Sequence, residues 1–173
     1  MNVLFLTISR LTDIETRGIY TDLMRKFRDE GHNVYIASPR ERRFKSATGV
    51  TQQEGVSILG VKTLNLQKTN VIEKGIATIL LEGAFKRAIK RYWGDVKFDL
   101  VLYSTPPITF TSVVRFIKRR NPNAVSYLLL KDIFPQNAVD LGMFSRRSLF
   151  YAYFRRKERL MYGVSDYIGC MSP

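Results

Sequence analysis

The chain has 173 residues and a mass of 20.0 kDa, the size of a single globular domain. Hydrophobic residues make up 45% and charged residues 25%, which excludes a disordered, collagen-like or disulfide-stabilised protein. The net charge is +13, with 28 Lys and Arg against 15 Asp and Glu. The single cysteine, Cys170, lies in apolar sequence, which predicts a small buried hydrophobic residue.

The positive charge is concentrated in four clusters, at residues 40–45, 85–97, 115–120 and 146–159. Such clusters indicate an anionic partner, namely a nucleic acid, an acidic membrane surface or a phosphorylated substrate. A solvated basic surface without any partner is the alternative. The N-terminal sequence lacks the features of a signal peptide, and no apolar run approaches the roughly 20 residues of a membrane span. We therefore expect a cytoplasmic protein.

The first third of the chain alternates strands with a helix. Residues 3–8 are a continuous apolar run, which is typical of a strand covered on both faces. Apolar residues at helical spacing predict a helix from Gly18 to about residue 30. Residues 33–37 form the next strand, which we expect Pro39 to end. Residues 50–61 contain either a third strand or a hairpin.

The remaining two thirds continue the alternation. The predicted elements are a helix over 71–93, a strand over 100–103, a helix over 108–119, a strand over 125–130, a helix over 148–162 and a strand over 167–171. Apolar strands separated by helices predict the α/β class, with a Rossmann-like doubly wound parallel sheet.

The helix over residues 71–93 is apolar on two different faces. Its apolar residues change sides at Gly83, and basic residues follow on the side that they leave. Such a helix either packs between two layers or touches something outside the domain, and basic residues beside aromatic ones suit a membrane interface. We predict that its aromatic residues are partly exposed and that its bases meet lipid phosphates. These predicted membrane contacts are Phe85, Lys86, Arg87, Lys90, Arg91, Tyr92 and Trp93.

The helix over residues 148–162 carries an apolar arc that includes Leu149, Phe150 and Tyr153. We expect most of this arc to lie in the core. Lys157 points into the middle of the arc, so its ammonium group must extend past apolar neighbours to water or find a partner.

Ligands of parallel α/β sheets bind at the carboxyl ends of the strands. Lys131 and Asp132 directly follow an apolar strand, so they are expected at that edge. The carboxylate of Asp132 there either accepts a proton or orients a hydroxyl group, or else it caps the following turn. Arg17 and Gly18 lie where a helix begins, and free backbone N–H groups at such a position favour anions. An ordinary capping loop is the alternative for these two residues.

Metal and cofactor motifs are absent from the sequence. The chain has one histidine, His32 in a predicted turn, and one cysteine, too few for a zinc site without carboxylates. Asp13 and Glu15 could hold a hard cation, but two acidic residues in a loop are commonplace. We expect no metal and no cofactor.

Four motifs follow one another along the chain. They are Leu23 with Gly31-His32-Asn33-Val34, Asp99-Leu100-Val101 with Ser104-Thr105-Pro106-Pro107, Asp132-Ile133-Phe134-Pro135-Gln136 with Leu141-Gly142, and Glu158 with Ser165-Asp166-Tyr167-Ile168 and Ser172. This ordered set resembles the N-terminal domain of retaining glycosyltransferases of the two-domain GT-B architecture, in the large family that includes bacterial polysaccharide enzymes. Many members carry two glycines where this chain has Arg17-Gly18.

The resemblance implies the N-terminal, acceptor-binding half of a GT-B fold, spanning residues 1–173, with the donor-binding C-terminal domain absent from this chain. It implies transfer of a sugar from a nucleotide-sugar, as substrate, to a lipid-linked or saccharide acceptor in capsular or surface polysaccharide biosynthesis. Together with the positions at the sheet edge, it points to Asp132 as the catalytic residue. The corresponding substrate-binding residues are Arg17, Gly18, Thr105, Lys131 and Gln136.

Acceptors in this branch of the family are typically polyprenyl-diphosphate-linked sugars of the inner leaflet. The resemblance therefore implies a peripheral protein on the inner face of the plasma membrane, with its basic clusters on anionic lipid. Two alternatives remain: a non-catalytic, membrane-anchoring subunit of a split glycosyltransferase, and a basic nucleic-acid-binding α/β domain. We expect no nucleic acid, because the basic clusters are scattered and no aromatic RNA-binding motif is present.

Overall fold

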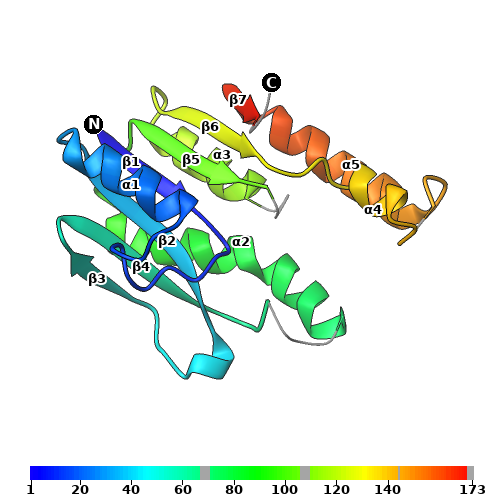
Figure 1. Cartoon of the computed structure of the whole chain (residues 1–173), viewed down its shortest axis with the longest axis horizontal. Helices are drawn as coiled ribbons and strands as arrows, with labels where there is room; N and C mark the ends of the chain where they lie inside the picture. The colour runs from blue at the N-terminus through cyan, green and yellow to red at the C-terminus, as the bar shows by residue number, and fades with distance from the viewer. Residues whose placement is uncertain (67–70, 106–109, 144, 171–173) are drawn as a thin grey trace.

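A computed structural model of the chain describes residues 1–66, 71–105, 110–143 and 145–170, with the side chains of residues 71–76 left aside. Its centre is a seven-stranded sheet in the order β3-β4-β2-β1-β5-β6-β7 (Figure 1). The strands are β1 (Asn2–Leu6), β2 (Asn33–Glu41), β3 (Gly49–Gln53), β4 (Val56–Thr63), β5 (Leu100–Ser104), β6 (Val125–Leu130) and β7 (Tyr167–Cys170). All pairings among these strands are parallel except that of β3 with β4. The α/β prediction is confirmed.

Helices cover both faces of the sheet. They are α1 (Ile19–Asp29), the short 3-10 helix η1 (Arg42–Phe44), α2 (Val71–Trp93), α3 (Thr111–Arg120), α4 (Gln136–Asp140) and α5 (Leu149–Tyr162). One face packs against α1 and the loop that precedes it, and the other packs against α2, α3 and the end of α5. Within β1, Val3 and Phe5 pack into the core on the α1 face of the sheet, whereas Leu4 and Leu6 pack into the core on the α2 and α3 face. This division explains why the strand is apolar throughout.

The segment left open between a strand and a hairpin forms a hairpin, β3–β4. Its turn consists of Glu54 and Gly55, which both have positive φ angles, of 44° and 79°. Glycine tolerates this conformation without steric cost, and the following strand can therefore turn back directly.

Strand β2 continues to Glu41, so the prediction that it ends at Pro39 is wrong. The carbonyl of Ala37 accepts a hydrogen bond from the N–H of Thr7, which follows β1. Backbone groups two residues apart in a strand point to the same side. The backbone nitrogen of Pro39, which has no hydrogen to donate, therefore faces the region beyond the end of β1. No hydrogen bond to β1 is lost there, and β2 keeps its pairing with β4 to its end.

The face that α2 buries differs from the predicted one. Phe85 is fully buried and lies 5.2 Å from the ring of Phe110, and Trp93 packs edge-on against Tyr35. The prediction that Phe85 and Trp93 are exposed membrane contacts is therefore wrong, because the second half of α2 lies on the sheet. Tyr92 is partly exposed, as expected, and its hydroxyl donates to the backbone carbonyl of Thr48.

Of the four basic residues predicted as lipid contacts, Lys86 is half-buried and Arg87, Lys90 and Arg91 are exposed. Their contact with lipid stays a prediction. The helix start predicted at residue 108 lies outside the described residues, as do Pro106, Pro107 and Ser172 of the family motifs.

Two further expectations about burial are wrong. Cys170 is exposed rather than buried, because β7 is an edge strand. The first half of α5 is also exposed, and 88% of Leu149 is accessible to solvent. The second half of α5 enters the core through Met161 and the buried Glu158, and Phe154 near the middle of the helix packs against the same core. Tyr162 and Arg155 both donate to the Glu158 carboxylate, so this buried charge is paired.

The carboxylate of Asp166 connects three elements of the fold. It accepts hydrogen bonds from the Lys118 ammonium at 2.6 Å and from the backbone N–H of Ser126 at 2.8 Å. Partial burial disfavours its ionised form, but these hydrogen bonds outweigh that effect and lower the pKa of Asp166. A lowered pKa in the folded state means that the ionised carboxylate stabilises the fold.

This contribution is present above the ordinary aspartate pKa and is lost as the pH falls through the lowered value. We expect the free energy of unfolding to fall as the pH is lowered through the acidic range below about pH 5, and the contribution of this group is modest because its side chain is 40% exposed. Urea unfolding over that pH range measures the effect. Asp166→Asn should remove it, whereas the same substitution at the exposed Asp95 should not. Equal pH profiles for both variants would contradict the assignment.

Candidate functional site

The carboxyl ends of β1, β5 and β6 lie at one edge of the sheet, because these three strands are neighbours and run parallel. Lys131, directly after β6, places its ammonium 4.0 Å from the centre of the Tyr20 ring. Tyr20 belongs to α1 and donates its hydroxyl hydrogen to Ser104, the last residue of β5, at 2.8 Å. Residues from all three segments are thus held together at the carboxyl end of the sheet, where ligands of this fold class bind.

Thr105 organises the loop that begins at Lys131. Its hydroxyl oxygen accepts hydrogen bonds from the backbone N–H groups of Lys131, at 2.9 Å, and Asp132, at 3.2 Å. Thr105 is only 1% exposed, which leaves almost no surface for the predicted contact with a substrate. Its observed role is to position the backbone of Lys131 and Asp132, which directly follow β6.

Asp132 is exposed at this edge, and its carboxylate bonds none of the residues that the structure describes. The backbone of Asp132 is fixed by Thr105, whereas its side chain remains available to a solute. This arrangement suits a group that accepts a proton from, or orients, a hydroxyl of a bound molecule. The catalytic role of Asp132 stays a prediction.

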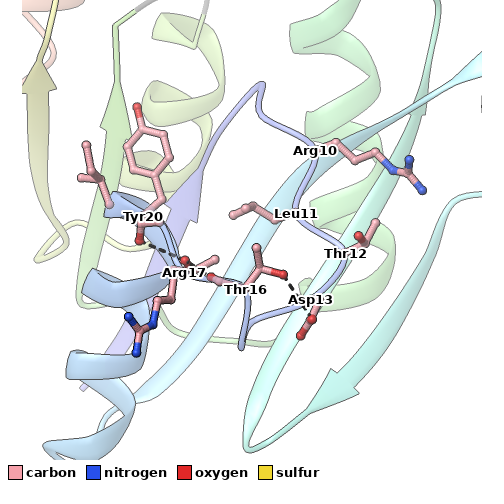
Figure 2. Close-up of a pocket in the computed structure, with 10 residues that line it drawn as sticks. Arg10, Leu11, Thr12, Asp13, Thr16, Arg17 and Tyr20 are labelled. Carbon is pink, nitrogen blue, oxygen red and sulfur yellow. Dashed lines mark hydrogen bonds between the residues drawn. The ribbon is translucent and has the colours of Figure 1, made fainter.

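A cavity of about 220 Å³ lies at the start of α1, lined by the loop that precedes this helix and by its first residues, Ile19 to Thr21 (Figure 2). Asp13 shapes this loop, since its carboxylate accepts from the Glu15 N–H at 2.9 Å and from the Thr16 hydroxyl at 3.2 Å. Arg10 and Arg17 extend to opposite sides of the cavity in Figure 2. The two guanidinium groups are therefore not arranged to bind one small anion together.

Gly18 is the N-cap residue of α1, but its N–H is not left for an anion. It donates to the carboxylate of Asp22 at 3.3 Å, and Asp22 is in turn paired with Arg25. A Cβ at Gly18 would lie 3.3 Å from the Thr21 hydroxyl, which itself donates to the Gly18 carbonyl. The absence of a side chain thus serves close packing at the start of the helix, which favours the capping-loop interpretation. The substrate contact predicted for Arg17, which is exposed, stays a prediction.

Gln136 opens α4, and its side-chain amide donates to Asp140 one turn later, at 2.6 Å. This bond holds the side chain along the helix. Its predicted contact with a substrate stays a prediction.

Sequence reasoning missed three residues near this edge: Tyr20, Arg10 and Phe44. The Arg10 guanidinium lies 3.8 Å from the centre of the Phe44 ring, and that of Arg43 lies 4.8 Å from the same ring. These cation–π contacts bring the basic cluster at residues 40–45 beside the first loop. The sequence revealed the basic cluster, but not its aromatic partner, because the contact joins segments more than thirty residues apart.

No group of three or more His, Cys, Asp or Glu side chains that could hold a metal ion occurs within the described residues. Both carboxylate oxygens of Asp13, the nearest candidate in the sequence, are engaged within its own loop. No helix in the described part of the chain is long and apolar enough to cross a membrane.

No protein-family model matches the chain, and a search of curated proteins finds no match. Solved structures that are similar to it include trehalose-6-phosphate synthase from E. coli bound with UDP-2-fluoro glucose and the OtsA apo structure. Their TM-scores are 0.63 and 0.61 at 7% and 8% sequence identity, and each alignment covers 99% of this chain and 40% of the other. The chain therefore spans less than half the length of these GT-B glycosyltransferases, and it shares with them the Rossmann-like α/β fold.

Proposed function

We propose that the chain is the N-terminal, acceptor-binding domain of a GT-B glycosyltransferase. The enzyme transfers a sugar from a nucleotide-sugar to a lipid-linked or saccharide acceptor in bacterial capsular or surface polysaccharide biosynthesis. The observation that carries this proposal is the meeting of Asp132, Lys131 and Tyr20 at the carboxyl edge of a sheet whose fold neighbours are GT-B glycosyltransferases. A donor-binding C-terminal domain completes the active site.

In this proposal Asp132 orients the acceptor hydroxyl and takes its proton. The acceptor oxygen then forms a bond to the anomeric carbon of the donor sugar, while the bond from that carbon to the nucleoside diphosphate breaks. The ammonium group of Lys131, which lies over the face of the Tyr20 ring, provides a positive charge beside Asp132 for an acceptor phosphate. The net charge of +13 favours a peripheral position on anionic lipid at the inner face of the plasma membrane.

The test is a transfer assay with the complete two-domain protein, a panel of labelled nucleotide-sugars and two acceptors, a soluble saccharide and a polyprenyl-diphosphate saccharide. A labelled glycolipid or saccharide identified by mass spectrometry supports the proposal. Failure of every donor with both acceptors, in a preparation that is folded and binds a nucleotide-sugar, contradicts it.

A second expected result concerns the isolated 173-residue chain. Since the donor site belongs to the other domain in this proposal, calorimetry with common nucleotide-sugars should find no dissociation constant below about 1 mM, or roughly −4 kcal/mol. Tight binding, or robust transfer by the chain alone, would contradict the assignment to the acceptor half.

A further inference from the structure

The turn after α4 and the first turns of α5 carry a group of large apolar side chains that lie mostly in solvent. Their exposures range from 50% for Tyr153 to 88% for Leu149. Isolated exposed apolar residues are normal, whereas a contiguous group marks an interaction surface. We call this group the α5 patch; it consists of Leu141, Met143, Leu149, Phe150 and Tyr153.

The position of the α5 patch explains why the core leaves it uncovered. Strand β6 ends at Leu130, and α4 with the first half of α5 lies beyond the carboxyl ends of β5 and β6, away from the sheet (Figure 1). An α-helix turns about 100° per residue, so Leu149 and Tyr153 share one side while Glu158 lies on the opposite, buried side. Phe134 and Phe154 pack 4.9 Å apart and fix the loop before α4 against the middle of α5.

Positive charges surround the α5 patch. Arg146 and Arg147 are exposed in the turn that leads into α5, and Arg156 and Arg159 are exposed further along it. Lys157 places its ammonium 5.9 Å from the centre of the Tyr153 ring, so the partner of this charge is an aromatic face. The one acidic residue among residues 141–160, Glu158, is buried and paired with Arg155. It therefore does not offset the surface charge.

We propose that the α5 patch docks this protein on an anionic phospholipid bilayer. Leu149 and Phe150 enter the boundary between headgroups and acyl chains, and the surrounding cations meet lipid phosphates. A surface with adjacent apolar and basic side chains fits such a bilayer, because each kind of contact alone binds only weakly. A second copy of the chain is a poor occupant, since two such basic surfaces repel each other.

The choice of a bilayer rests on the proposed function, in which the acceptor is lipid-linked. Docking on a bilayer also explains how the α5 patch would serve the candidate site. The loop of Asp132 leads directly into α4, so a domain bound through the α5 patch holds its candidate site next to the headgroups. The α5 patch takes the place of the lipid contact predicted on α2 from the sequence, because two aromatic residues of that prediction, Phe85 and Trp93, are buried.

Vesicle sedimentation of the 173-residue chain tests the proposal. The chain should sediment with vesicles rich in phosphatidylglycerol and much less with pure phosphatidylcholine. Arg146→Gln with Arg147→Gln should weaken partitioning about thirtyfold, since each base near an anionic surface contributes about 1 kcal/mol. Leu149→Ser with Phe150→Ser should weaken it at least tenfold, because apolar insertion is lost.

Matched controls come from α2, which has the same kinds of exposed residue. Ile79 and Leu80 are 72% and 55% exposed, and Lys90 and Arg91 are exposed as well. Ile79→Ser with Leu80→Ser, and Lys90→Gln with Arg91→Gln, should change partitioning less than threefold. All four double variants should melt like the parent, because they alter only exposed side chains.

A fluorescence measurement reports insertion directly. The exposed Cys170 is first changed to Ser, and Phe150→Cys is then labelled with an environment-sensitive dye. Its emission should shift to the blue on addition of anionic vesicles, whereas the same dye at Leu80→Cys should not respond.

Several results would overturn the proposal. These are equal partitioning to both vesicle types, loss of binding only in the α2 variants, or tight salt-sensitive binding to DNA or RNA without binding to lipid. Self-association abolished by the Leu149 and Phe150 pair, without vesicle binding, would assign the α5 patch to a protein contact instead. None of these outcomes changes the transfer to a soluble saccharide that the proposed function predicts. The docking proposal can therefore fail while the proposed function stands, and the two failures are distinguishable.

Discussion

Changing Asp132 to Asn in the complete transferase is expected to lower kcat by about 10²–10⁴-fold, the range for loss of a general acid–base group. The amide cannot accept the proton of the acceptor hydroxyl, although it is nearly the same size as the carboxylate. The fold should survive, because the Asp132 carboxylate bonds none of the described residues and the backbone is held by Thr105. Steady-state transfer assays and thermal melting measure the two properties separately.

Asp140→Asn is a matched control for that experiment. Asp140 is also exposed and is the last residue of α4, but its carboxylate already accepts a hydrogen bond from Gln136. We expect its variant to keep kcat within about threefold, since it has no part in the proton transfer. Near-normal turnover in the Asp132 variant, or equal losses in both, would remove Asp132 from the proposed mechanism.

Changing Phe85 to Ala is expected to lower the free energy of unfolding by about 3–5 kcal/mol, because it opens a cavity in the core. Phe85 is fully buried on α2 and packs against Phe110 at 5.2 Å between ring centres. For a chain of this size the loss corresponds to roughly 10 °C or more in Tm. Urea unfolding and calorimetry both measure it.

Ile79→Ala on the same helix is the control, since Ile79 is 72% exposed. Its cost should stay within about 0.5 kcal/mol, as is usual for surface substitutions. A small loss for Phe85→Ala, similar to that for Ile79→Ala, would contradict the observed side of α2 and restore Phe85 to the surface.

Local patterns in the sequence were sufficient for most elements of the fold. The apolar run at the N-terminus identified β1, because a strand with helices on both faces has no polar side. The predicted helix ends, at about residue 30 and at residue 119, lie within one residue of the observed ends of α1 and α3. The strand–helix alternation then fixed the α/β class, since parallel strands require crossover helices.

The carboxyl edge of the sheet could also be predicted, because β6 directly precedes Lys131 and Asp132 in the sequence. The roles of the residues around this edge could not be predicted. Thr105 and Gly18 looked like substrate contacts, yet one binds the loop backbone and the other is engaged by Asp22. Local sequence shows which residues are near a strand end, but hydrogen-bond partners come from distant segments.

The sequence by itself determined the strands, the helices and the fold class, because each depends on spacing between near neighbours. Only the tertiary structure decided which apolar residues of α2 and of α5 are buried. Helix α2 is apolar on two sides and α5 along one wide arc, and burial depends on where the sheet lies. The sheet covers Phe85 but ends before Leu149 and Phe150, and it is this limit of the sheet that leaves the α5 patch in solvent.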